Sequence, residues 1–174
     1  MNVLVRKMGS LKLLKVELVL GTIFSAIAMI GIPVSMFCLA PALLVEPLAW
    51  GIALGIMLFF GLVGYGLFVR PYRLYLQLPD VQMEHDDEFL YIHGKKEAKI
   101  PLAELTYVYI SAELPFIFQE GFLREMVIYY FSDEYGKIVL DIDGFGKYKL
   151  HFVPHAKEME GKLLKFFNDA MNNT

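Results

Sequence analysis

The chain has 174 residues, of which 56% are hydrophobic and 20% charged, and its formal net charge is −3. Residues 1–73 carry six Lys or Arg and two Glu, net +4, whereas residues 74–174 carry ten Lys or Arg and seventeen Asp or Glu, net −7. The acidic second region argues against nucleic acid as a partner, because neutralising phosphates requires clustered Lys and Arg. The single cysteine, Cys38, excludes an intramolecular disulfide.

Two long apolar runs, at about residues 16–40 and 48–69, dominate the first 73 residues. The first run carries one charge, Glu17 at its edge, and the second carries none. Each exceeds the roughly 20 residues that a helix needs to cross a bilayer. The first is also longer than the ~7–15-residue apolar core of a cleaved signal peptide. The sequence therefore predicts that residues 1–73 form an N-terminal segment and a two-helix transmembrane hairpin.

Basic residues flank this pair of runs and are missing from the connection between them. They are Arg6, Lys7, Lys12 and Lys15 before the first run, and Arg70 and Arg73 after the second. Positive charge in short flanking segments marks the cytoplasmic side of a membrane. We therefore expect an integral protein of a bacterial inner or plasma membrane, in contact with membrane lipid, with both termini and the soluble domain in the cytoplasm.

Small residues at helical spacing occur in both runs. Gly31 and Ser35 lie four apart in the first, and Gly51 and Gly55 lie four apart in the second. Small side chains let helix backbones approach closely in lipid. Two interpretations stay open: the two helices pack on each other, or a face is left for another membrane protein or for a second subunit in a homo-oligomer.

From residue 74 onward, short alternating stretches replace the apolar runs. They predict strands, followed after Pro154 by an amphipathic helix over 155–171. The expected strands are 81–85, 88–93, 97–100, 106–112, 125–132, 137–142 and 148–153. The apolar face of the expected helix is formed by Met159, Leu163, Phe166, Phe167 and Ala170. Residues 74–174 are thus expected to form a small antiparallel β-barrel or sandwich with a C-terminal capping helix, which makes the whole chain an α+β membrane protein.

Residues 88–93 (EFLYIH) and 99–108 (KIPLAELTYV) carry a resemblance to the bacterial pleckstrin-homology-like (PH-like) domains. The shared pattern is a strand, a tight turn, a second strand ending in Ile-Pro, and a short turn before the next strand. The resemblance covers about residues 75–172 and implies a PH-like fold with a C-terminal helix behind a membrane hairpin. It transfers no functional residue. The turn at 85–88 is acidic where phosphoinositide-binding members are basic, so we expect no phosphoinositide binding.

The segment 114–123 is unusually apolar for a connection between two strands, since loops normally lie at the surface and are polar. It is either a packed connection or an exposed contact for a partner protein or the membrane. The contact candidates are Phe116, Ile117, Phe118, Phe122 and Leu123.

Sequence signatures of catalysis are missing. The chain has no nucleophile elbow and no P-loop, and its carboxylates are scattered. The Asp141–Gly144 stretch resembles the start of a calcium loop, but Phe152 stands where the terminal Glu is required. We expect no enzyme activity and no catalytic, cofactor-binding or metal-binding residues. Two functions stay open: an adaptor or assembly factor that binds a protein partner, and an immunity or resistance protein against a membrane-active toxin.

Overall fold

The computed structural model describes residues 1–9, 11–94, 96–115, 119, 125–126, 128–129 and 134–172. The chain divides into two compact units, one of residues 12–76 and the other of residues 1–11 together with 77–174. We call them the helical unit and the β unit. The β unit takes in the first eleven residues, which the sequence analysis placed with the membrane helices in domain 1–73.

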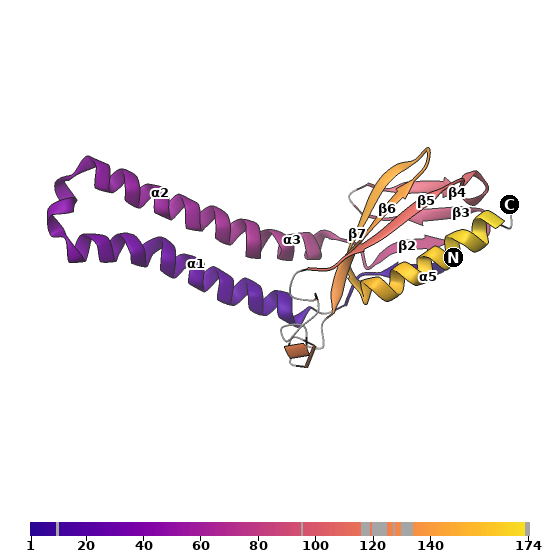
Figure 1. The fold of residues 1–174 in the computed structure, drawn as a ribbon, viewed down its shortest axis with the longest axis horizontal. Coiled ribbons are helices and arrows are strands. Elements are labelled where there is room, and N and C mark those ends of the chain that lie inside the picture. The colour runs from indigo at the N-terminus through magenta and orange to yellow at the C-terminus, as the bar shows by residue number, and fades with distance from the viewer. Residues whose placement is uncertain are drawn as a thin grey trace. The chain divides into compact units, whose positions relative to one another are not determined.

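The helical unit is a hairpin of two long helices (Figure 1). Helix α1 (Lys12–Leu39) is joined by a short 3-10 turn, η1 (Pro41–Val45), to α2 (Pro47–Gly64). A π-helical turn, η2 (Tyr65–Val69), continues α2 into α3 (Arg70–Gln77). The stretches Lys12–Leu39 and Pro47–Gln77 are both long and apolar enough to cross a membrane, with mean hydropathies of 2.1 and 2.3.

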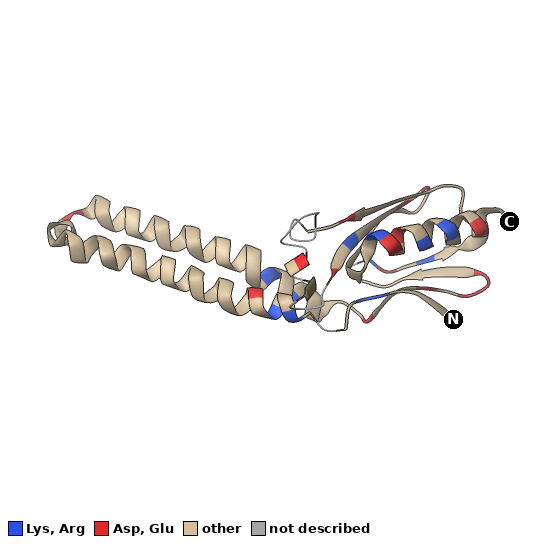
Figure 2. Ribbon diagram, turned by 60° about the horizontal axis from the view of Figure 1, so that its bottom comes forward, with Lys and Arg blue, Asp and Glu red and all other residues tan. Residues whose placement is uncertain are grey.

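Apolar side chains cover the outside of this hairpin. Phe24 is 68% exposed and Leu62 is 72% exposed, and only 11% of each apolar window is buried. A helix that is apolar on all sides needs an apolar environment around it. Lys and Arg gather instead at the end of the unit where α1 begins and α3 lies, whereas the connection at the other end carries only acidic charge (Figure 2).

The helices approach each other at two glycines that the sequence analysis did not select. A Cβ atom built on Gly21 would collide with the Phe68 ring, and one on Gly64 would lie 2.6 Å from the Ser25 Oγ. By contrast, no atom lies within 4 Å of a Cβ built on Gly51 or Gly55, and the nearest to one on Gly31 belongs to Ile27 of the same helix. The Ser35 hydroxyl donates to the carbonyl of Gly31, also within its own helix.

The β unit contains two antiparallel sheets and not a closed barrel. One sheet has the order β1-β2-β3-β4, and the other has the order β5-β6-β7. The first comprises β1 (Asn2–Arg6), β2 (Val81–His85), β3 (Phe89–Ile92) and β4 (Ala98–Pro101). The second comprises β5 (Val108–Glu113), β6 (Tyr135–Ile142) and β7 (Gly146–Pro154). A 3-10 turn, η3 (Leu102–Glu104), links β4 to β5, and α5 (Ala156–Asn172) ends the described chain.

Strand β1 was not predicted from the sequence. It pairs antiparallel with β2, for example Asn2 opposite His85 and Arg6 opposite Val81. The whole helical unit is therefore inserted in the connection between two neighbouring strands of one sheet. The Lys7 Nζ donates to the Leu78 carbonyl at 2.7 Å, and the Met8 amide donates to the Phe152 carbonyl at 2.9 Å.

One hydrophobic core is shared by both sheets and α5. Leu163 and Phe167 are buried at 1% exposure on the helix face that the sequence predicted. Gln82 is the only buried polar side chain among the described residues, and it joins the sheets. Its Nε2 donates to the His151 carbonyl at 2.6 Å, and its Oε1 accepts from the His151 amide at 2.9 Å. Its polar atoms are thereby satisfied, which removes most of the cost of burying them.

The strand expected at 125–132 is wrong where the structure describes that segment. Residues 125, 126, 128 and 129 are helical. A short apolar run of this kind fits a helix as well as a strand, and Glu125 and Met126 at its start are good helix formers. The other predicted strands and the C-terminal helix are confirmed, within a few residues at their ends.

Candidate functional site

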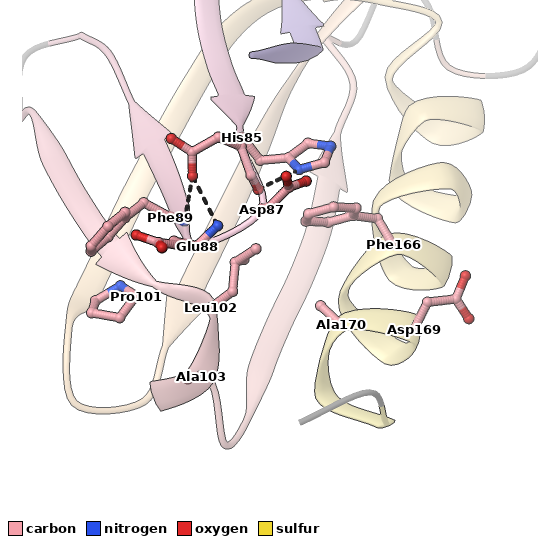
Figure 3. A pocket seen from close by; sticks show the side chains of 11 residues that line it. His85, Asp87, Glu88, Phe89, Pro101, Leu102, Ala103, Phe166, Asp169 and Ala170 are labelled. Atoms are coloured by element: carbon pink, nitrogen blue, oxygen red, sulfur yellow. Dashed lines mark hydrogen bonds between the residues drawn. The ribbon is translucent and has the colours of Figure 1, made fainter.

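A cleft of about 590 Å³ opens in the β unit, bordered by three segments that are far apart in sequence (Figure 3). They are the β2–β3 turn, the corner where β4 passes into η3, and the last turns of α5. The lining residues are His85, Asp86, Asp87, Glu88, Phe89, Pro101, Leu102, Ala103, Phe166, Asp169 and Ala170.

The β2–β3 turn is fixed by the side chain of Asp86. Its Oδ1 accepts from the amides of Glu88 at 3.0 Å and Phe89 at 2.7 Å, and its Oδ2 accepts from the Tyr91 hydroxyl at 2.9 Å. The amides of Glu88 and Phe89, with help from the Tyr91 hydroxyl, hold the pKa of Asp86 below its ordinary value. Donation to this carboxylate in turn raises the pKa of Tyr91. Asp86 is therefore an ionised residue that shapes the turn, and it leaves Asp87 and Glu88 exposed at the corner.

Internal contacts hold the walls of the cleft together. The Leu102 amide donates to the Glu88 carbonyl at 2.8 Å, which ties η3 to the turn. The Phe166 ring lies 4.7 Å from the His85 ring, between centroids, and 5.3 Å from the ring of the buried Phe167. These bonds and ring contacts are all made within the chain. The cleft is therefore preformed, as most ligand sites are.

Negative charge dominates the lining, which contains four carboxylates, one imidazole and no Lys or Arg. Within the described part of the chain, the carboxylates of Asp87, Glu88 and Asp169 make no hydrogen bond or ion pair. All three side chains are exposed at the rim. The nearby Lys99 places its Nζ 3.7 Å from the centroid of the Phe89 ring. Apolar surface from Leu102, Ala103, Phe166 and Ala170 lies between the charged groups.

The chemistry of this lining suits binding. None of the lining residues is a Ser, Thr, Cys, Tyr or Lys, so the cleft presents no side-chain nucleophile of these kinds. Asp86 is already engaged in the turn. Among the described residues, no three His, Cys, Asp or Glu side chains are grouped so that they could hold a metal ion. An apolar surface with carboxylates at its rim matches a ligand that combines apolar and cationic groups.

The sequence predicts contact residues in the segment 114–123. Phe116, Ile117, Phe118, Phe122 and Leu123 lie outside the described residues, so their exposure stays a prediction. The sequence did identify the acidic turn at 85–88 and the helix face with Phe166 and Ala170. It gave no signal that these two segments, about 80 residues apart, border one cleft.

Comparison with known proteins finds no match: no family model matches the chain, and no curated protein or solved structure shows significant similarity to it.

Proposed function

We propose that this chain is a membrane-anchored interaction module without enzyme activity, and that its β unit binds a protein partner through the cleft. The observation that carries the proposal is the preformed cleft itself. It combines an apolar floor with unpaired carboxylates at the rim, and its lining contains no Ser, Thr, Cys, Tyr or Lys. Binding sites are typically concave, largely apolar and supplied with a few polar groups that fix orientation.

The helical unit is the proposed membrane anchor. The order of its helices and the flanking strands along the chain determines on which side of the membrane these strands lie. Strand β1 precedes the two apolar helices and β2 follows them, yet β1 and β2 pair in one sheet. If both helices cross the bilayer, the two strands emerge on the same side. The basic residues at that end of the hairpin favour the cytoplasmic face under the positive-inside rule, and the resemblance to bacterial PH-like domains favours a bacterial membrane.

The arrangement of the β unit supports the PH-like resemblance. A four-stranded and a three-stranded antiparallel sheet are followed by a C-terminal helix that packs its buried face on the shared core. In this interpretation, the first strand comes before the membrane hairpin. The acidic turn at 85–88 disfavours binding of anionic phosphoinositides, and we therefore propose a protein as the partner.

Site-specific photocrosslinking of the full chain in native membranes tests the proposal. A photoreactive amino acid replaces the exposed Asp87 at the cleft rim, and a control places it at Tyr109, which is 53% exposed on β5. A second control combines the Asp87 probe with Ala103→Trp, which fills the cleft from an exposed position.

We expect a discrete protein adduct at position 87 that is lost in the Ala103→Trp variant and missing at position 109. Equal adducts at both positions, or an adduct that persists in the filled cleft, would contradict the proposal. Mass spectrometry of the adduct then separates a toxin, which would indicate immunity, from a component of a membrane complex, which would indicate an adaptor.

A further inference from the structure

We infer that the occupant of the cleft is a short cationic amphipathic segment of the partner protein, with an apolar anchor side chain flanked by Lys or Arg. This inference rests on the proposed function and specifies the chemistry of the partner. It depends on the charge of the lining, the apolar floor between the charges, and the size of the space.

The charge of the rim selects for cations. Asp87 and Glu88 lie on the β2–β3 turn, and Asp169 borders the cleft from α5, with its carboxylate directed away from the turn (Figure 3). Covering carboxylates with a neutral partner would remove their water without giving them a counter-charge, which is unfavourable. An anionic ligand such as a phosphate would be repelled. A Lys or Arg on each side of the bound segment supplies the missing charge, and its charge-assisted bonds fix the orientation of the segment.

The floor requires an apolar group as well. Leu102 and Ala103 of η3 face Phe166 and Ala170 of α5 across the cleft. The chain itself shows how a cation is accommodated beside this turn, because the Lys99 Nζ lies over the Phe89 ring. Phe166, on the opposite wall, offers a similar aromatic surface to a cation of the partner.

The volume limits the length of the occupant. A space of about 590 Å³ lies within the range of sites for small ligands and short peptide stretches. It admits an anchor side chain with its neighbours, and not a folded surface. A linear segment in a tail or loop of the partner therefore fits best.

Peptide binding to the full chain in nanodiscs of neutral phosphatidylcholine tests the inference. Three fluorescein-labelled peptides share a core with one Phe and two Leu, and differ only in flanking residues: Lys and Arg, Ser and Gln, or Asp and Glu. We expect the cationic peptide to bind at least tenfold more tightly than the neutral one, with an affinity that falls as salt is raised. The acidic peptide should not bind.

Charge variants locate the binding. Asp87→Asn, Glu88→Gln and Asp169→Asn together should weaken the cationic peptide at least tenfold, and Ala103→Arg should abolish its binding. All four residues are exposed, so folding should be preserved, which thermal unfolding verifies. The matched control neutralises three carboxylates outside the lining, Glu97→Gln, Glu125→Gln and Glu160→Gln, and should change the affinity less than twofold.

The outcomes separate this inference from the proposed function. Tighter binding of the neutral or acidic peptide, blocked by Ala103→Arg, would overturn the cationic assignment and leave the cleft as a binding site. If the two triple variants weaken binding of the cationic peptide equally, only the net charge of the chain matters, and the inference is overturned. A failure of all three peptides to bind would also overturn it. Loss of the proposed function itself would show in the crosslinking at position 87.

Discussion

The two units of this chain use apolar side chains in opposite ways. In the helical unit, residues such as Phe24 and Leu62 point outward and most of the apolar surface is exposed. In the β unit, residues such as Leu140 and Phe167 point inward, at 0% and 1% exposure. The difference shows that hydrophobicity alone does not identify a core. The environment that each unit is built for decides which direction is inside.

The sharpest test of this contrast truncates one side chain in each unit. Phe167→Ala should destabilise the β unit by about 3–5 kcal/mol, because it removes a buried ring and leaves a cavity. Leu62→Ala should leave β-unit stability unchanged, since Leu62 lies on the outside of the hairpin. Thermal unfolding of the full chain in nanodiscs, followed by near-ultraviolet circular dichroism, measures both. Similar losses for the two variants would mean that the hairpin surface is not a lipid-facing one.

A charge substitution tests the environment of the hairpin directly. Leu58→Lys places an ammonium on an outward position of α2 that is 66% exposed, and near the bilayer centre it should cost about 2.5–3.5 kcal/mol of insertion free energy. The matched Tyr109→Lys, on the exposed face of β5, should change stability by less than ~0.5 kcal/mol. A membrane-insertion assay and thermal unfolding report the two effects. An insertion free energy that Leu58→Lys leaves unchanged would contradict a transmembrane α2.

The smallest expected effect concerns pH and the turn that borders the cleft. The folded pKa of Asp86 lies below its ordinary value of 3.8, so its ionised form favours the folded state. This stabilisation is fully present above pH 3.8 and is lost as the pH falls through the lower, folded pKa. Melting temperatures of the wild type and Asp86→Asn should therefore differ most near neutral pH and converge as the pH falls through the lowered, folded pKa of Asp86. A difference that grows on acidification would contradict the assigned role.

The sequence anticipated the features that depend on local pattern. The two apolar runs are recognisable by length and composition, which need no tertiary information. Strands β2 to β7 follow from alternation and turn residues, and α5 follows from its apolar face. The 125–132 segment shows where this breaks down, because an apolar run of that length supports either a helix or a strand.

Features that depend on contacts between segments far apart in the chain could not be predicted from the sequence. Strand β1 is only five residues long, and its partner β2 begins 75 positions after its last residue, with the whole helical unit between them. Its pattern alone carries no sign of that partner. The cleft likewise combines a turn, a corner and a helix end from separate parts of the chain, and local sequence pattern does not indicate that these three segments meet.

The position of β1 sets an order of events during synthesis. The strand leaves the ribosome before the helical unit does, and its partner β2 begins only 75 positions after the last residue of β1. At about 5–20 residues per second, β1 waits roughly 4 to 15 seconds for β2. During that interval its edge is unpaired and open to competing strands, which favours a chaperone or rapid membrane insertion as its protection. The β unit can close its first sheet only after the entire hairpin has been made, so the folding of the β unit waits for the synthesis of the helical unit.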